Sequence, residues 1–576
     1  MSAEGFRSPL IQRLMLAVAL IVGFAAAVEQ MWLTDDAYIS FRYAKNFVEG
    51  HGLVFNLGER VEGFTNFSWT MLMALGLKMG ITIEGWAHAW SIFFYLASIV
   101  LLGIYAMRLG ESDGRRAAVL PIAALGAALH VDWSGFATGG LETSMFIFLV
   151  LAGFMILTRE AQEGRRFILA ACVFAAATLT RPDGIFFAFL AGLWVLWRAR
   201  RKVSAALLYG GCFFSIYGPF VAWRLWYYGE FFPNTYYAKS GDLSWYSQGI
   251  KYAYLYYQQY WVLLLAPLAV FGLLVFRRAK GRPMPRWMPQ AVLALLFLAG
   301  YTAAIVRVGG DFMFARMLLP TAPFALILLQ VLFVEWVSHR TRWIQAEAVA
   351  IFAALMAFTP PPVTDTIWRW GVSNERMIFS PAVAERLDRK GEILEHYFAG
   401  LPVRIGYFGM EARVVYRTTI PTAIECETGL TDRYIAHQKI TERKRPGHEK
   451  RAPAEYLIGQ RKTHFTFSPN EVVLALDRHI PRFEIGLKDE DGRTLRGRIL
   501  HWDPAMMAAL KERGASFQDF PTFLDEYIDS LVREDPRQVQ RDLAKFRLFY
   551  FDHNDDPERL EKISGYLRSR GFSPGG

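Results

Sequence analysis

The chain has 576 residues, of which 53% are hydrophobic, 15% aromatic and 20% charged, and its formal net charge at pH 7 is +10. Basic residues beside membrane spans account for such a charge, because they set topology, and we therefore expect no nucleic-acid partner. The three cysteines, Cys172, Cys212 and Cys426, are too scattered for a disulfide framework or a zinc site.

The chain divides into two unlike parts. Residues 1–359 contain repeated apolar runs, about 14–23 residues long, which span a hydrocarbon core once flanking residues are included. Residues 360–576 contain no such run. The proline-rich stretch FTPPPVTD, 358–365, ends the last apolar segment. The sequence therefore predicts a membrane domain over 1–359 and a soluble domain over 360–576, which is large enough to bury its own core.

The loops between apolar segments carry an orientation signal. Basic loops tend to be cytoplasmic, and here they alternate with acidic and aromatic loops, which should face outward. This alternation predicts a polytopic α-helical membrane protein with about 11 transmembrane helices, its N-terminus inside and its soluble domain outside. The predicted spans are 11–31, 86–107, 117–131, 141–157, 167–180, 185–198, 203–226, 259–277, 288–306, 319–338 and 343–359.

The first external loop, 31–85, contains two further helical patterns. The segment 67–81 would reverse the orientation of every later basic loop if it crossed the membrane, so we expect a juxtamembrane helix. The segment 36–50 has apolar residues at helical spacing and predicts a surface helix that ends at the glycines that follow. A cleaved signal peptide is the alternative interpretation of the N-terminus.

The loop stretch 31–69 is dense in charge and opens with an acidic pair, Asp35 and Asp36. Acids that take a proton and bases that hold a leaving anion are what a reaction on a lipid-linked, phosphate-bearing substrate requires. The alternative is that these are solvated loop charges. Neighbouring residues project about 100° apart on a helix, so the two aspartates cannot both serve one atom directly. Either is a candidate base, and the other is then free for sugar or a divalent cation.

Several blocks of the sequence together resemble a known family. In type and order they are similar to the terminal β-arabinofuranosyltransferases of mycobacterial cell walls and their proteobacterial relatives, which are membrane glycosyltransferases of the GT-C type. The blocks are DDAYISFRYAKNFVEGHGLVFNLGERVEGFTNFSW (35–69), GGLETSMF (139–146), RPDG (181–184), FPNTYYAK (232–239), GGDFMFARMLLP (309–320), ETGLTDRYIA (427–436) and RPGHEK (445–450).

The resemblance implies an activity and a location. It implies transfer of a sugar, arabinofuranose in the family, from a polyprenyl-phosphate donor to an acceptor glycan or glycoconjugate. The reaction would take place on the outer face of a bacterial inner membrane, with the domain 360–576 in the periplasm. Membrane lipid is then a further partner. Another pentose or hexose is an open alternative for the sugar, and a transporter or flippase, or a structural component of the envelope, is an alternative of another class.

The candidate site residues follow from the blocks and from the loops predicted to be external. Asp35 and Asp36 are the catalytic candidates. The candidates for the donor phosphate are Arg42, Lys239, Arg307 and Arg316, because arginine makes forked contacts with phosphate. The candidates for sugar hydroxyls, or for an oxygen-bound cation such as Mg²⁺, Mn²⁺ or Ca²⁺, are Glu62, Glu142 and Asp311. Arg433, Arg445 and His448 are candidates for donor phosphate or acceptor glycan. The chain carries no histidine spacing that would identify a metal site.

The soluble domain has the patterns of a mixed α/β fold. Residues 401–417 and 478–487 predict strands, whereas 503–514, 523–535 and 555–571 predict helices.

Overall fold

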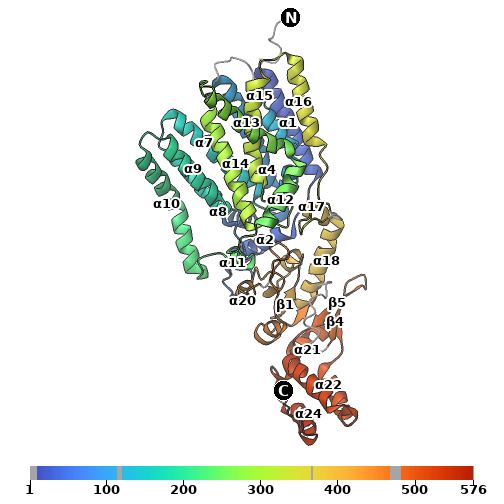
Figure 1. Ribbon diagram of the computed structural model, residues 1–576. Coiled ribbons are helices and arrows are strands. Elements are labelled where there is room, and N and C mark those ends of the chain that lie inside the picture. Colours follow the sequence, from blue (N-terminus) through green and yellow to red (C-terminus); the bar gives the residue numbers. More distant parts are fainter. Residues whose placement is uncertain (1–8, 113–119, 365–367, 441, 468–481, 575–576) are drawn as a thin grey trace.

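A computed structural model describes residues 9–112, 120–364, 368–440, 442–467 and 482–574. Long helices form a bundle at one end of the molecule, and all the named strands of the described residues lie in a smaller body at the other end (Figure 1). In Figure 1, α1 (Pro9–Glu29) lies in the bundle and α24 (Pro557–Ser569) lies at the far end of the smaller body. The chain is thus a polytopic α-helical membrane protein with a C-terminal mixed α/β domain, as the sequence predicts.

The bundle is built mainly from apolar helices. Among the described residues, seven helices are long and apolar enough to cross a membrane, namely α1, α4, α7, α10, α13, α14 and α15 with the turn before it. The main helices are α1 (Pro9–Glu29), α4 (Ile83–Ser112), α7 (Thr143–Glu163), α8 (Ile168–Thr180), α9 (Gly184–Arg198), α10 (Lys202–Tyr228), α12 (Tyr246–Gln259), α13 (Trp261–Ala279), α14 (Met288–Val308), α15 (Ala322–Trp336) and α16 (Arg342–Ala357).

One predicted span differs from the structure. The segment 117–131, of which 117–119 lie outside the described residues, contains α5 (Ile122–Ala128), which has only 7 residues. It is followed directly by α6 (Val131–Phe136). The chain breaks between them because the His130 side chain accepts a hydrogen bond from the backbone N–H of Trp133 at 3.3 Å and so caps a new helix. The described part of this segment and the residues after it therefore form two short helices rather than one continuous helix.

The two helices predicted in the first external loop are both present. They are α2 (Asp35–Val48) and α3 (Phe67–Lys78), and α2 lies at the end of the bundle that faces the smaller body (Figure 1). Most of α2 is buried, including its polar residues Ser40 and Asn46. Two short helices of the same region, α11 (Asn234–Ala238) and α20 (Arg433–Ala436), pack against each other.

The smaller body contains a mixed sheet of six strands in the order β2-β1-β3-β5-β4-β6. β1 pairs in parallel with β2 and β3, and the remaining neighbours are antiparallel. The strands are β1 (Arg404–Tyr407), β2 (Thr422–Glu425), β3 (Phe465–Thr466), β4 (Phe483–Lys488), β5 (Thr494–Ile499) and β6 (Ser516–Phe517). Helix α18 (Pro381–Phe398), which follows the short α17 (Glu375–Ile378), connects the bundle to this sheet (Figure 1).

The helices near the C-terminus begin where the sequence places its signals. α21 (Pro504–Glu512), α22 (Phe520–Ser530), α23 (Pro536–Phe546) and α24 (Pro557–Ser569) each follow an aspartate whose side chain accepts a backbone N–H of the first turn. Proline in the first turn costs these helices no hydrogen bond, because that N–H would have no partner within the helix. The helical patterns expected over 503–514, 523–535 and 555–571 are confirmed.

The strand predicted over 401–417 is only half right. β1 ends at Tyr407, and the second half forms α19 (Ala412–Tyr416). The backbone N–H groups of Ala412 and Arg413, at the start of α19, donate to the two carboxylate oxygens of Asp35 at 2.9 Å each. A partner 377 residues away in the chain supplies the cap, so the local pattern alone could not predict this helix.

Candidate active site

The two adjacent aspartates at the start of α2 have different surroundings. Both carboxylate oxygens of Asp35 are used by the α19 backbone, and burial raises the pKa of this carboxyl to about 7 even though the two hydrogen bonds act in the opposite direction. Asp35 therefore holds α2 against the sheet-containing body. Each of its two oxygens already accepts a hydrogen bond from the protein.

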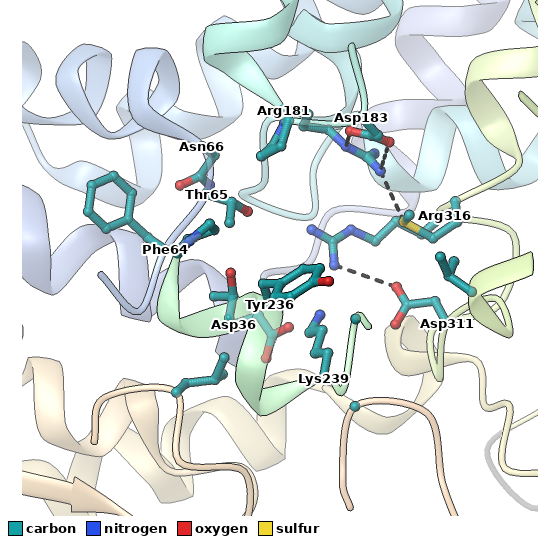
Figure 2. Close-up of a pocket in the computed structure, with 18 of the residues that line it drawn as sticks. Asp36, Phe64, Thr65, Asn66, Arg181, Asp183, Tyr236, Lys239, Asp311 and Arg316 are labelled. Atoms are coloured by element: carbon teal, nitrogen blue, oxygen red, sulfur yellow. Dashed lines mark hydrogen bonds and ion pairs between the residues drawn. The ribbon is translucent and has the colours of Figure 1, made fainter. Parts of the chain in front are cut away.

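Asp36, by contrast, receives no hydrogen bond from any residue that the structure describes. Its side chain points into a cavity beside Lys239 (Figure 2). Burial raises the pKa of Asp36, while the positive charges of Lys239 and Arg316 lower it in part. Asp36 is thus a partly exposed carboxylate with free lone pairs and a raised affinity for a proton, which are the properties of a general base.

The cavity in Figure 2, here called the bundle cavity, has a volume of about 450 Å³. Its wall comes from loops and helix ends that are far apart in the sequence. The charged residues of this wall are Asp36, Glu142, Arg181, Asp183, Lys239, Asp311, Arg316 and Arg443, and Asn66 and Tyr236 lie among them. Acidic and basic groups of five predicted outer loops, together with Arg443 of the soluble domain, are therefore assembled around one space.

A buried ionic network forms one side of the bundle cavity. Glu142, just before α7, accepts hydrogen bonds from Asn66 at 2.9 Å and from Arg316 at 3.3 Å, and lies 3.8 Å from Arg181. Arg316 also lies 3.7 Å from Asp311. Burial alone would raise the pKa of Glu142, but Arg316 and Arg181 outweigh it and hold the pKa below its ordinary value. Glu142 is therefore an ionised anchor for two arginines.

Lys239 is the lysine in the wall of the same cavity. It follows α11 directly, its side chain is exposed, and Figure 2 shows it directed into the cavity between Asp36 and Asp311. No residue in the described part of the chain makes a side-chain hydrogen bond or ion pair with its ammonium group. The bundle cavity thus combines the buried guanidinium groups of Arg181 and Arg316 with an ammonium group that has no partner among the described residues, a combination suited to binding an anion.

A mostly apolar groove of about 560 Å³, here called the lateral groove, adjoins the bundle cavity. The two spaces share Thr65, Pro182, Phe232 and Pro233 in their walls. The remaining wall of the groove comes largely from α10 and includes Phe214, Phe220 and Leu225. Helix α10 lies at the outer edge of the bundle (Figure 1).

A third space, here called the outer cavity, has a volume of about 660 Å³ and lies between the bundle and the sheet-containing body. Its wall includes residues of α18, the β4–β5 hairpin and the 445–448 segment. Among the described residues, Asp36 alone lines both the bundle cavity and the outer cavity. A small space of about 50 Å³ that also contacts Asp36, Lys239 and His448 lies between them.

Some sequence-predicted residues lie away from these cavities. The guanidinium of Arg42 donates to the backbone carbonyls of Phe55, Val415 and Ile420 at 2.8, 2.7 and 2.5 Å, so it joins α2 to the sheet-containing body. Glu62 lies 3.2 Å from Arg224 in the wall of the lateral groove.

Arg307 and Arg433 are also outside both cavities. Arg307 is exposed in the last turn of α14. Arg433 lies 3.3 Å from Glu230 and donates to the carbonyls of Arg60 and Tyr228. His448, by contrast, lines the outer cavity, where burial and the neighbouring Arg445 lower its pKa to about 4.

Several residues of the site were not among the sequence candidates, including Asp183 and Tyr236 of the bundle cavity. Arg181 belongs to the RPDG block, so block membership was the signal that could have identified it. Asn66, the N-cap residue of α3, orients Glu142. Glu375 lines the outer cavity and accepts a hydrogen bond from the Ser373 hydroxyl at 2.8 Å, and it lies outside every block.

The sequence left open whether the site binds a divalent cation. Among the described residues, no group of three or more His, Cys, Asp or Glu side chains is arranged to hold a metal ion. In the bundle cavity Glu142 and Asp311 are both engaged by Arg316, so their charge is already compensated by the protein.

Comparison with known proteins gives two curated relatives, and no protein-family model matches the chain. The terminal β-(1→2)-arabinofuranosyltransferase of Mycobacterium tuberculosis is 33% identical over 333 residues, which covers 53% of this chain and 52% of that protein. The protein of the same name from Corynebacterium glutamicum is 28% identical over 333 residues, covering 52% of this chain and 48% of that protein.

Solved structures align over most of the chain but at low identity. ArnT from Cupriavidus metallidurans bound to undecaprenyl phosphate has a TM-score of 0.49 and 14% identity, covering 84% of this chain and 97% of that one. The Archaeoglobus fulgidus oligosaccharyltransferase in the apo form has a TM-score of 0.49 and 11% identity, covering 85% and 74%. The chain spans about half the length of the curated relatives, and over that part it is similar to terminal β-(1→2)-arabinofuranosyltransferases, which confirms the resemblance indicated by the sequence blocks.

Proposed function

We propose that the protein is a glycosyltransferase that moves a sugar from a polyprenyl-phosphate donor to a hydroxyl of an acceptor glycan. The observation that carries the proposal is the position of Asp36, which is the one described residue in the walls of both large cavities. A base that serves a transfer reaction must contact the acceptor hydroxyl while it faces the donor. Asp36 meets that condition, and Asp35 does not.

The bundle cavity suits the phosphoryl sugar of the donor. Arg316 and Lys239 supply positive charge for the phosphate. Arg181 adds a further positive charge, and its ion pairs with Glu142 and Asp183 hold it in the wall. Asp311 and the ring of Tyr236 are available to the sugar. The lateral groove adjoins this space and offers an apolar surface to the polyprenyl chain.

The reaction can be written from these positions. The acceptor hydroxyl, approaching from the outer cavity, gives its proton to Asp36 as its oxygen attacks the anomeric carbon. The bond between that carbon and the phosphate oxygen breaks, and the electron pair leaves with the polyprenyl phosphate. Lys239 and Arg316 stabilise the negative charge that develops on the leaving oxygen. Asp35 acts as a positioning residue, because it fixes the first turn of α2 against α19.

The sugar and the orientation belong to the same proposal. Arabinofuranose is the sugar that the names of the relatives support. The alternation of basic and acidic loops supports a cytoplasmic N-terminus, a membrane domain over 1–359 and a periplasmic domain over 360–576 in a bacterial inner membrane. The reaction would then take place on the periplasmic face.

The test is transfer by the purified full chain from a panel of polyprenyl-phosphate pentoses and hexoses, with the product linkage determined. Detergent-solubilised wild-type protein should consume one donor with no membrane potential or second compartment, and Asp36→Asn should not. Consumption of none of the donors, together with translocation of a glycan by reconstituted protein, would contradict the proposal in favour of a transporter.

A further inference from the structure

The charges in the wall of the outer cavity are unevenly distributed. The end next to Asp36 carries the carboxylates of Glu375 and Glu427. The part formed by α18 and the β4–β5 hairpin carries the guanidinium groups of Arg386, Arg389 and Arg493 and one carboxylate, that of Asp489, whose Oδ1 accepts the backbone N–H of Arg493 at 2.7 Å. A ligand that fills this space therefore meets acceptors of hydrogen bonds at one end and a net positive charge at the other.

The helical part of this basic wall follows from the spacing of α18. Val383, Arg386, Lys390 and Ile393 recur at intervals of three or four residues, which places them on one face of the helix. All four line the outer cavity, and so does Arg389 beside them. α18 also packs against β4, so the hairpin that carries Arg493 and Thr494 forms a neighbouring part of the same wall.

Two other cations in this wall are already committed to buried groups. Lys390 forms an ion pair with buried Glu411 and donates to the carbonyl of Phe467 at 2.6 Å. Arg445 lies 3.7 Å from Glu375, with its guanidinium 5.1 Å from the ring centre of Phe312. These two residues hold the cavity wall together.

The three guanidinium groups of α18 and the hairpin are not committed in this way. Among the described residues, Arg389 pairs with Glu385 alone, whose side chain is 73% exposed, and Arg493 pairs with Asp491, both more than 60% exposed. Within the part of the chain that the structure describes, the side chain of Arg386 forms no ion pair or hydrogen bond. Exposed pairs of this kind contribute little and exchange readily for another anion.

The acidic end of the cavity favours a different chemical group. Glu375 is buried, is held by Ser373, and has its segment tied to the Asp311 loop through backbone hydrogen bonds between Ser373 and both Phe312 and Phe314. Fixed carboxylates of this kind accept hydrogen bonds from sugar hydroxyls. The outer cavity thus offers hydroxyl recognition next to the base and anion recognition farther out.

We propose that the acceptor is a hydroxyl-rich glycan that carries an anionic substituent, a phosphate or a carboxylate, away from the hydroxyl that is glycosylated, and that Arg386, Arg389 and Arg493 bind this substituent. That this glycan is the acceptor of a transfer reaction rests on the proposed function, whereas its binding to the three arginines does not. Guanidinium groups are suited to it because their planar donors match both phosphate and carboxylate geometry.

Matched probes test the proposal directly by calorimetric titration of the solubilised full chain. Tetragalacturonate is compared with its methyl ester, and a maltooligosaccharide 6-phosphate with the plain maltooligosaccharide, so that each pair differs only in charge. We expect at least one anionic probe to bind about tenfold more tightly than its neutral partner. The pair that shows the preference identifies carboxylate or phosphate as the group. Equal affinities within both pairs, or no binding of any probe, would overturn the proposal.

Variants connect the preference to the three arginines. In the combined variant Arg386→Gln, Arg389→Gln, Arg493→Gln the preference for the anionic probe should fall about tenfold, whereas Arg541→Gln, at an exposed position of α23, should leave it unchanged. Should the combined variant fail to fold, salt gives an independent measurement, because the wild-type preference must weaken between 50 mM and 500 mM NaCl. A preference that survives both changes contradicts the proposal.

This binding assay separates the inference from the proposed function. Charge-selective binding through these arginines in a protein that consumes no polyprenyl-phosphate sugar would contradict the proposed function alone. Sugar transfer by a protein that does not distinguish the charged from the neutral probes would contradict this inference alone.

Discussion

The two cavities that meet at Asp36 hold their charges in different ways. In the bundle cavity Glu142 is buried between Arg316 and Arg181, and Asn66 fixes its orientation. In the basic part of the outer cavity the arginines project from α18 and from a hairpin, and the partners of Arg389 and Arg493 among the described residues are exposed acids. A buried network keeps its geometry whether or not a ligand is present, whereas exposed pairs rearrange around the ligand that arrives.

Because of this difference, the two regions are suited to different ligands. A rigid, charge-compensated pocket is suited to one invariant group, such as a phosphoryl sugar whose leaving oxygen must be met at a fixed place. An adaptable basic wall is suited to an acceptor whose substituent varies in position. Substitutions in the bundle cavity should therefore affect turnover or folding, and those in the outer cavity should affect acceptor affinity.

The largest effect is expected at the junction of the two regions. Asp36→Asn keeps the size of the side chain but removes the charge that accepts the proton, so turnover should fall by about 10²–10⁴-fold. Donor affinity and the melting temperature should change little, because no described residue depends on a hydrogen bond to Asp36. Steady-state kinetics of the purified variant measure the loss. Turnover within threefold of wild type would remove Asp36 from the chemistry.

The next largest effect concerns the stability of the bundle cavity. Glu142→Gln leaves Arg316 and Arg181 buried without their shared counter-charge, which should cost about 3–5 kcal/mol of unfolding free energy. Thermal unfolding in detergent measures the change. Glu163→Gln, at the exposed end of the same helix, is the matched control and should leave the melting temperature unchanged. A similar melting temperature for both variants would mean that the network is not the rigid part of the site.

The sequence was most informative where local pattern and site coincide. The sequence predicted a helix over 36–50, and the external loops and the blocks identified Asp36, Glu142, Lys239, Asp311 and Arg316 as candidates. The structure brings these five residues together around one cavity. The use of Arg42 could not be predicted, because two of its acceptors are carbonyls more than 370 residues away. The division of labour between the aspartates was equally hidden, since it depends on the distant start of α19.

Asp35→Asn should have a smaller effect, and of a different kind from that of Asp36→Asn. An asparagine oxygen can accept from only one of the two α19 N–H groups, and its amide faces the other, so about 1–3 kcal/mol of stability should be lost. Acceptor KM should rise because Glu411, the residue just before α19, lines the outer cavity, while kcat should fall less than tenfold. A loss of kcat as large as that of Asp36→Asn, with unchanged stability, would reverse the two roles.

The smallest expected effect is a shift in pH dependence through Lys239. Burial raises the pKa of Asp36 above the ordinary value of 3.8, and Lys239 is the largest influence in the opposite direction. A base must be ionised to accept a proton, so turnover should fall as the pH drops through the pKa of Asp36 in the complex, at a pH above 3.8. In Lys239→Gln the carboxylate loses this favourable charge, the pKa of Asp36 rises further, and the acid limb of the kcat profile should move to higher pH.

The direction of that shift distinguishes two roles for Lys239. If the lysine contacted only the donor phosphate, Lys239→Gln would raise donor KM and leave the acid limb of kcat in place. Lys251→Gln is the matched control, since that lysine lies on α12 against the ring of Trp370 and lines neither cavity. An acid limb that moves to lower pH in Lys239→Gln would contradict the placement of this charge beside Asp36, because removal of a nearby cation cannot make a carboxyl group more acidic.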